Sequence, residues 1–203
     1  NFEDRKISRG GGSPEKNYSL SFSGNTGDAS ESYATTDFNP DTYNLNLGCT
    51  VSYWVKPDET GNTMFAFGRK HNNNQRFVFG INRHRQGYFA IGSNKLTTSW
   101  VNMDTPVEES LLVQDGSYWN LKTDGTWYHF AVTYDDRTDT SSGADRKIYV
   151  NGVLRHTGNI NWSSTGGSTG GMYFGGRNVS DAYQNGWACK LDEVSIFNTA
   201  KSI

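Results

Sequence analysis

Acidic side chains are the first residues in this chain whose type and spacing could do chemistry. Glycoside hydrolysis needs two carboxylates on either side of the scissile bond, roughly 5–9.5 Å apart. No Glu-x-Asp-x-x-Glu or Glu-x-Asp-x-Glu string occurs, and Asp192 and Glu193 are neighbours, which in a strand would point to opposite faces. His129 and His156 have no serine or cysteine nucleophile in a recognisable setting. We therefore predict that the chain is not an enzyme.

Two acidic loops could instead hold a metal ion. Calcium takes six to eight oxygen ligands from carboxylates, amides and carbonyls. Asp135, Asp136 and Asp139 lie close together in one segment, and Asp28 and Glu31 lie together in another. Either loop could contribute to a calcium site, and the alternative is that both are simply solvated. Zinc is not expected, because the 4 histidines and 2 cysteines lack tetrahedral spacing.

Aromatic and polar residues in predicted loops are the candidates for a ligand site. Flat aromatic faces pack against the C–H faces of sugars, while amides, carboxylates and arginine bind hydroxyl groups. The predicted ligand-binding residues are Trp100, Trp119, Trp162, Arg177, Asp181 and Tyr183. For each aromatic residue the alternative is a lid over the core. Trp187 also falls in a predicted loop, whereas Trp54 and Trp127 lie in predicted strands and are assigned to the core.

Composition excludes several classes of partner. Charged residues make up 20% of the 203 residues and the net charge is −2, so the chain lacks the basic stripe that nucleic acid requires. It also lacks a polybasic membrane patch and any apolar run of roughly 18 residues, so no membrane insertion is expected. Aromatic residues reach 14%, which suits a core built from few but large apolar side chains.

Short stretches with period-two alternation, bounded by Gly, Asn, Asp and Ser, are the elements that would position these residues. The predicted strands are 18–23, 50–56, 64–69, 76–82, 88–91, 127–134, 146–150, 172–175 and 190–197. In 127–134, Tyr128, Phe130, Val132 and Tyr134 are predicted to face inward and His129, Ala131 and Thr133 outward. Asn151-Gly152 predicts a tight hairpin.

The domain organisation is predicted to be simple. Residues 1–17 are rich in Gly, Ser and charge and are interpreted as a linker or N-terminal arm, followed by one domain over 18–203. The polar start without methionine is interpreted as an interior cut from a longer polypeptide. Cys49 and Cys189 either form one bridge between strands or are two small buried hydrophobic residues.

Six segments, taken in order, resemble a known family. They are 19–24 (SLSFSG), 49–57 (CTVSYWVKP), 125–135 (GTWYHFAVTYD), 147–152 (KIYVNG), 173–176 (YFGG) and 191–198 (LDEVSIFN). As a set they resemble the laminin-G-like, concanavalin-A-like lectin and glucanase jelly-roll domains over about residues 18–200. The resemblance implies an all-β fold, a two-sheet antiparallel jelly-roll sandwich. It also implies a calcium ion held at a rim between loops by Asp28 and Asp192.

The same resemblance implies a function in recognition. We expect a non-catalytic module that binds carbohydrate or mediates adhesion, located outside the cell or on a surface, as part of a larger protein. Its expected partner is a glycan or a surface protein. The alternative is a structural protein–protein module of a virion fibre, a capsid decoration or a surface appendage.

Overall fold

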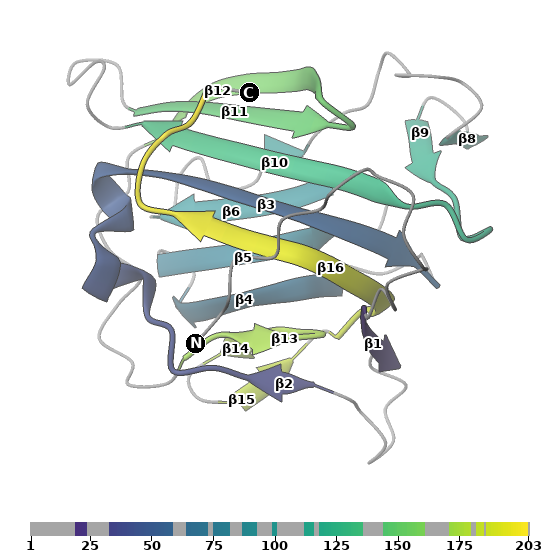
Figure 1. Cartoon of the computed structure of the whole chain (residues 1–203), viewed down its shortest axis with the longest axis horizontal. Coiled ribbons are helices and arrows are strands. Elements are labelled where there is room, and N and C mark those ends of the chain that lie inside the picture. Colours follow the sequence, from purple (N-terminus) through teal and green to yellow (C-terminus); the bar gives the residue numbers. More distant parts are fainter. Residues whose placement is uncertain are drawn as a thin grey trace, which may run out of the picture.

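Two β-sheets packed face to face make up the described part of this computed structural model (Figure 1). The described residues are 19–23, 33–58, 64–72, 75–81, 87–92, 99–100, 112–115, 118–135, 144–160, 171–179, 182–184 and 186–202. Within these ranges there is no α-helix, and no helix that could cross a membrane was found. The predicted all-β sandwich is confirmed. The predicted arm at 1–17 lies outside the described residues.

The first sheet has six strands in the order β1-β16-β3-β10-β11-β12, and it lies in front in Figure 1. Its strands are β1 (Leu20–Ser23), β16 (Ala188–Phe197), β3 (Gly48–Pro57), β10 (Tyr128–Asp135), β11 (Ala144–Val150) and β12 (Val153–Ile160). Every neighbouring pair is antiparallel. The predicted hairpin joins β11 to β12, with Asn151 and Gly152 at φ 50° and 79°, as a type I′ turn requires.

The second sheet lies behind the first and has the order β15-β14-β4-β5-β6-β7, with β13 and β2 also attached through β4. Its strands are β15 (Ala182–Gln184), β14 (Arg177–Val179), β4 (Met64–Asn72), β5 (Gln75–Ile81), β6 (Gly87–Gly92), β7 (Ser99–Trp100), β13 (Tyr173–Phe174) and β2 (Ala34–Thr35). One pair, β14 with β4, is parallel, so the sheets are not wholly antiparallel. The remaining elements are the β8–β9 hairpin (Leu112–Asp115, Tyr118–Leu121) and the 3₁₀ helices η1 (Pro40–Tyr43) and η2 (Leu45–Leu47).

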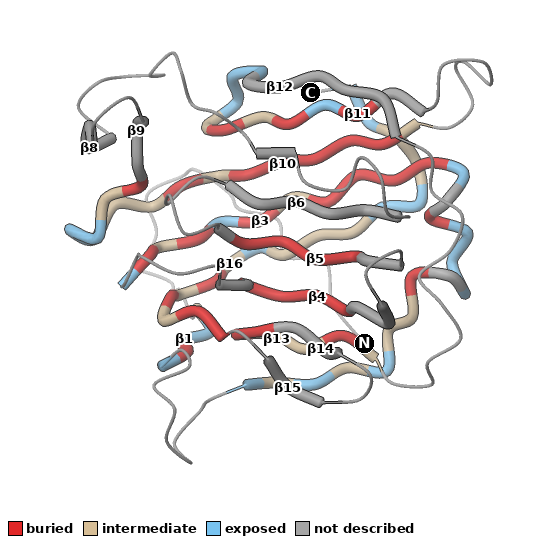
Figure 2. The backbone as a smooth tube through the Cα atoms, turned by 180° about the vertical axis from the view of Figure 1, so that it is seen from behind, coloured by how far each residue is buried: buried red, intermediate tan, exposed pale blue. Residues whose placement is uncertain are grey.

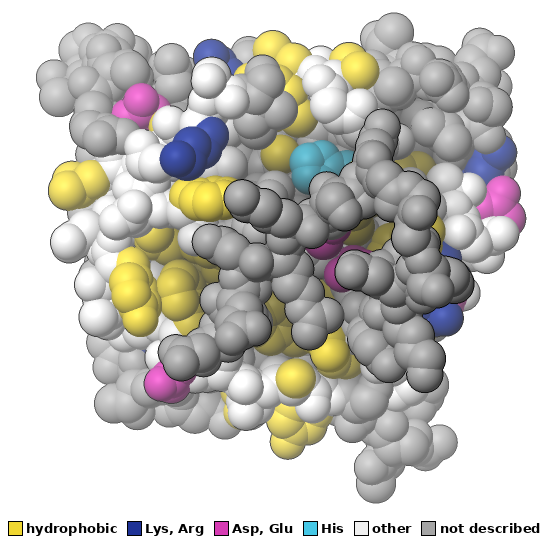
Figure 3. Space-filling model, in the orientation of Figure 1, with side chains coloured by type: hydrophobic (Ala, Val, Ile, Leu, Met, Phe, Trp, Pro, Cys, Tyr) yellow, Lys and Arg dark blue, Asp and Glu magenta, His cyan; other side chains and the backbone are white. Residues whose placement is uncertain are grey.

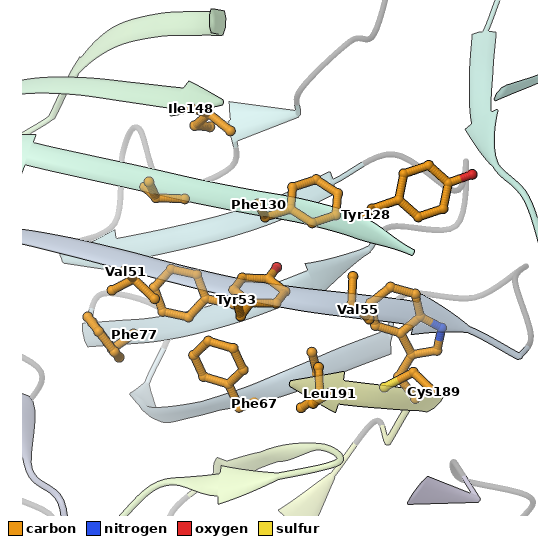
Figure 4. Close-up of a cluster of buried hydrophobic side chains, with 14 of the residues drawn as sticks. Val51, Tyr53, Val55, Phe67, Phe77, Tyr128, Phe130, Ile148, Cys189 and Leu191 are labelled. Carbon is orange, nitrogen blue, oxygen red and sulfur yellow. The ribbon is translucent and has the colours of Figure 1, made fainter. Parts of the chain in front are cut away.

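Aromatic rings fill the space between the sheets (Figure 4). The Tyr53 ring on β3 meets Phe67 of β4 edge-on, with ring centroids 5.0 Å apart, and stacks on Phe130 of β10 at 5.6 Å. Such pairs contribute about 0.5–1.5 kcal/mol beyond the burial of their area. Buried residues run along β3, β10, β4 and β5, through the middle of both sheets (Figure 2). The core therefore joins the central strands of the two layers.

In strand β10 the inward-facing residues were predicted correctly, whereas two of the residues predicted to face outward are also buried. The four residues predicted to face inward are buried, namely Tyr128, Phe130, Val132 and Tyr134. Ala131 and Thr133, predicted to face outward, are also buried, with exposed fractions of 1% and 6%. The C-terminal segment packs over Thr50, which is opposite Thr133 on β3: the Thr50 hydroxyl donates to the Thr199 carbonyl at 2.9 Å, and the Lys201 amide donates to that hydroxyl at 2.8 Å. The segment that contacts Thr50 lies about 150 residues later in the sequence, so the alternation within a single strand cannot predict this contact.

The predicted alternative of a disulfide between Cys49 and Cys189 is wrong. Cys49 is opposite Tyr134 near one end of β3, whereas Cys189 is opposite Pro57 at the other end. From position 49 to position 57 a strand advances about 26 Å, far beyond the roughly 7 Å that a disulfide allows between Cα atoms. Both thiols are free and buried, and burial raises the pKa of the Cys49 thiol to about 12.

The hydroxyl group of Tyr53 makes no hydrogen bond within the described part of the chain, although it is fully buried. Burial raises the pKa of this phenol well above its ordinary value. We expect Tyr53→Phe to stabilise the domain by about 1 kcal/mol, because it removes an unsatisfied buried polar group. Urea unfolding followed by circular dichroism measures the change.

Tyr128→Phe is the matched control for this prediction. The Tyr128 hydroxyl accepts a hydrogen bond from the Lys122 amide at 2.7 Å, so this variant should lose about 1 kcal/mol instead. Equal destabilisation by the two variants would show that the Tyr53 hydroxyl has a partner after all.

Candidate functional site

The structure brings some of the predicted ligand residues together and separates others. Arg177 on β14 and Tyr183 on β15 lie on adjacent antiparallel strands, where Arg177 is opposite Gln184 and Asn178 is opposite Tyr183. Trp100 lies on β7, at the other edge of the same sheet. Strands β4, β5 and β6 lie between β14 and β7, a separation of about 19 Å at 4.8 Å per strand. Trp100 therefore belongs to a different edge from the other two residues.

The remaining predicted ligand residues are Trp119, Trp162 and Asp181. Trp119 lies on β9, in the separate β8–β9 hairpin. Trp162 and Asp181 lie outside the described residues. A single ligand site built from all six residues is thus not assembled by the described strands, and the role of each in binding stays a prediction.

The predicted calcium site is described only at Asp192. Its carboxylate is half-buried on β16, and one oxygen, Oδ1, accepts a hydrogen bond from the Glu193 amide at 2.8 Å. Asp28, the other predicted ligand, lies outside the described residues, as do Glu31, Asp136 and Asp139. Within the described part of the chain no three acidic, histidine or cysteine side chains gather as metal ligands. Calcium takes six to eight oxygen ligands, so the single described carboxylate does not test this site, and bound calcium stays a prediction.

The predicted locations of two tryptophans, Trp54 and Trp187, are wrong. Trp187, expected in a loop, is fully buried, and its amide donates to the Gly175 carbonyl at 3.0 Å. Trp54, expected in the core, is 36% exposed on the outer face of β3. The alternation of Val51, Tyr53 and Val55 toward the core was the signal that could have placed Trp54 outside. Trp127 precedes β10 and is half-buried.

Four side chains form what we call the Trp54 patch: Trp54, His129, Asp192 and Glu193. In the register of the six-stranded sheet, Asp192 of β16 is opposite Trp54 of β3, which is opposite His129 of β10. The Trp54 and His129 rings lie 5.1 Å apart at 50°. Figure 3 views this outer face, with histidine and acidic side chains near its centre. The patch thus combines an exposed indole with groups that bind hydroxyls.

A β-bulge in β16 shapes one side of the Trp54 patch. The register with β3 shifts between Asp192 and Ser195, and Glu193 has a left-handed φ of 47°. Leu191 before the bulge and Val194 after it both pack on the core. The bulge breaks the strand alternation, so the prediction that Asp192 and Glu193 point to opposite faces is wrong. Bulges of this kind re-aim side chains and occur frequently beside functional sites.

Burial and the charge of Glu193 act in opposite directions on the pKa of His129. Burial lowers the pKa of His129 below its ordinary value of 6.5, and the negative charge of Glu193 opposes this in part. Its backbone is fixed by the turn, because the His129 amide donates to Asn151 Oδ1 at 2.8 Å and the Asn151 amide donates to the His129 carbonyl at 2.8 Å. Next to the patch, the Lys56 ammonium lies 5.8 Å from the centre of the Trp127 ring.

The lowered pKa of His129 predicts a pH dependence of stability. Below about pH 6.5 the unfolded chain takes up a proton at this residue before the folded protein does. The free energy of unfolding should therefore fall as the pH drops from 7 toward 5.5, and His129→Gln should flatten part of that fall. Urea unfolding of both proteins across this range measures it. Parallel pH profiles would contradict the assignment.

Comparison with known proteins gives a family and a set of similar folds. Residues 25–202 match the model of the concanavalin A-like lectin/glucanases superfamily. The Ruminococcus gnavus IT-sialidase CBM40, solved with alpha2,3 sialyllactose, aligns over 92% of both chains at 11% identity and a TM-score of 0.56. The binding domain of Botulinum neurotoxin DC, in complex with rat synaptotagmin II, aligns over 93% of this chain at 13% identity and a TM-score of 0.58.

A further structure, described as the crystal structure of a receptor binding domain, aligns over 93% of this chain at 15% identity and a TM-score of 0.58. This chain spans only 41% of the length of that domain, and also 41% of the toxin binding domain. No curated protein matches the sequence at a significant level. At these identities the structures show a shared fold, whereas the family match covers most of the chain. The chain belongs to the concanavalin A-like lectin/glucanases superfamily.

Proposed function

We propose that this chain is a non-catalytic recognition module that binds carbohydrate. The observation that carries the proposal is its membership of a lectin and glucanase superfamily over residues 25–202. The similar CBM40 domain was solved with a sialylated sugar, and the similar toxin domain with a protein receptor. We further propose that the module works outside the cell or on a surface as part of a larger protein, where glycans and receptors are displayed.

Binding without catalysis is the better fit to the Trp54 patch. The general acid of a glycosidase is held protonated by an apolar environment, whereas Glu193 is exposed to water on the face of a sheet. Asp192 Oδ1 accepts a hydrogen bond from the Glu193 amide within the bulge, so this carboxylate also stabilises the local backbone. An exposed indole beside carboxylates suits reversible binding of a sugar.

A glycan-array screen of the purified chain, run with calcium and again with chelator, tests this function. Specific binding supports the proposal, and loss of binding in chelator would support a calcium ion at or beside the site. Chromatography of any bound oligosaccharide after incubation should recover it intact; cleavage would overturn the non-catalytic part. A blank array in both conditions would favour the second candidate.

That second candidate is a structural protein–protein module. Tyr43 and Leu47, on η1 and η2, are 52% and 53% exposed, and the Tyr43 ring stacks on Phe38 at 5.0 Å. Hydrophobic side chains are visible on the side of the molecule where these helices lie (Figure 3, left). Light scattering over a range of concentrations tests it, because a packing module should self-associate or bind its parent assembly.

A further inference from the structure

We infer that a neutral sugar residue binds the outer face of the six-stranded sheet, with its apolar face stacked on Trp54 and its hydroxyl groups bonded to His129, Asp192 and Glu193. The inference rests on the proposed function and gives it a location and a class of ligand. That location differs from the loops and sheet edges that carry Trp100, Arg177 and Tyr183.

Trp54 is the platform of this site. It lies on β3, between β16 and β10, and so at an inner position of the sheet and not at its edge. On a sheet face, cross-strand neighbours are about 4.5–5.5 Å apart between Cβ atoms, which places Asp192 and His129 on either side of the indole. The His129 ring, tilted 50° to the indole, forms a wall beside it.

The flanking groups can both donate to and accept from hydroxyl groups. Neutral imidazole has one donor and one acceptor nitrogen, and a carboxylate has about four acceptor positions. Asp192 uses one of its oxygens to accept from the Glu193 amide, which leaves further acceptor capacity on the same group. Glu193 is exposed beside it. A sugar hydroxyl that approaches the Trp54 edge would therefore meet acceptors on one side and an imidazole on the other.

The backbone of Glu193 provides an independent indication of function. A left-handed φ is strained for a non-glycine residue, and such strain is concentrated at ligand-binding sites. Here the strained residue interrupts β16 directly after Asp192, which is opposite the exposed Trp54. The charge of Glu193 also acts on His129. The bulge thus carries strain at the point where it brings a second carboxylate toward the patch.

The charges of the Trp54 patch select against acidic sugars. Asp192 and Glu193 are two carboxylates, and burial of His129 favours its neutral form, so no cation within the patch offsets them. Two lysines flank the patch: Lys56, two residues along β3, lies over the Trp127 ring, and Lys190, two residues before Asp192 on β16, is opposite Lys56. Both lie farther along the strands from Trp54 than Asp192, which is its direct neighbour. A sugar carboxylate stacked on Trp54 would be repelled, whereas the hydroxyls of a neutral pyranose would not.

Calorimetric titration at pH 7 with lactose, maltotriose, cellotriose, chitotriose and 3′-sialyllactose tests the inference. We expect a neutral sugar to bind and Trp54→Ala to raise its Kd at least about tenfold, as for other aromatic hot spots. Trp54→Phe keeps a ring and should retain more of the affinity. Phe197→Ala removes a 43% exposed aromatic from another strand position of the same face and should leave the Kd unchanged. Glu193→Gln should weaken binding several-fold.

The outcomes separate this site from the proposed function. Unchanged neutral-sugar binding by Trp54→Ala would overturn the site and leave carbohydrate recognition standing. Tighter binding of 3′-sialyllactose than of any neutral sugar would overturn the charge argument. If neither these sugars nor the array give binding to the unaltered chain, the site and the proposed function fall together.

Discussion

Replacing Gly171 with alanine is expected to destabilise the domain by about 3 kcal/mol or more, enough to unfold a marginally stable protein. A Cβ atom at this position would overlap the Thr36 carbonyl oxygen and lie 2.9 Å from the Asp37 Cα atom. Both are backbone, so no side chain can rotate away. The next residue, Met172, is fully buried, and its carbonyl accepts from the Thr36 amide at 3.0 Å.

The clash at Gly171 would spread because it lies where two sheet segments are joined. Movement of the Gly171 backbone away from Thr36 would pull Met172 out of the core and break the pairing of β13 with β2, in which Tyr173 is opposite Thr35. Overpacking of this kind costs about 1–3 kcal/mol even where side chains can relax. Here the opposing atoms are backbone atoms of Thr36 and Asp37, directly after β2, and the Thr36 amide is itself bonded to the Met172 carbonyl, which is why a larger loss is expected.

Urea unfolding followed by circular dichroism measures this loss, and Gly152→Ala is the matched control. Gly152 has a left-handed φ of 79°, yet a Cβ atom there would meet nothing within 4 Å. Its replacement should cost only about 1 kcal/mol of backbone strain. If the two variants lost the same stability, the predicted overlap of the new Cβ atom with the Thr36 carbonyl would be contradicted.

The strands of this fold were readable from the sequence wherever one face is buried. Alternation in 127–134 and 50–56 predicted β10 and β3 within two residues at each end. The β-bulge in β16 was not predicted, because a left-handed Glu193 has no composition signal and depends on the partner strand. Short strands such as β7, β14 and β15 were also missed, since two or three residues carry too little pattern.

The candidate site was less predictable than the fold because its geometry depends on strand order. Sequence order places Trp100 before Arg177 and Tyr183 but does not say that they lie at opposite edges of a sheet. The residues of the Trp54 patch come from positions 54, 129, 192 and 193, and only the order β16-β3-β10 makes them neighbours. The chemistry of the patch is visible in the residue types; its assembly is not.

Trp187 and Trp54 differ in burial, so their replacement by alanine should differ greatly in its effect on stability. Trp187 is fully buried in the core cluster, where the sequence suggested a loop aromatic. Trp187→Ala should cost about 3–5 kcal/mol, because it removes the largest apolar side chain from a packed interior and leaves a cavity. Trp54→Ala should cost about 1 kcal/mol or less, since its indole is 36% exposed on the outer face of β3.

These two variants make one experiment, because the same truncation is made once in the core and once on the outer surface. Urea unfolding should be followed by circular dichroism, since removing an indole alters fluorescence in both proteins. Trp187→Phe should recover part of the loss by refilling the cavity. Equal stability losses at the two positions would mean that the indole of Trp54 is as buried as that of Trp187. Because the proposed sugar stacks on an exposed Trp54, the same result would also contradict the proposed binding site.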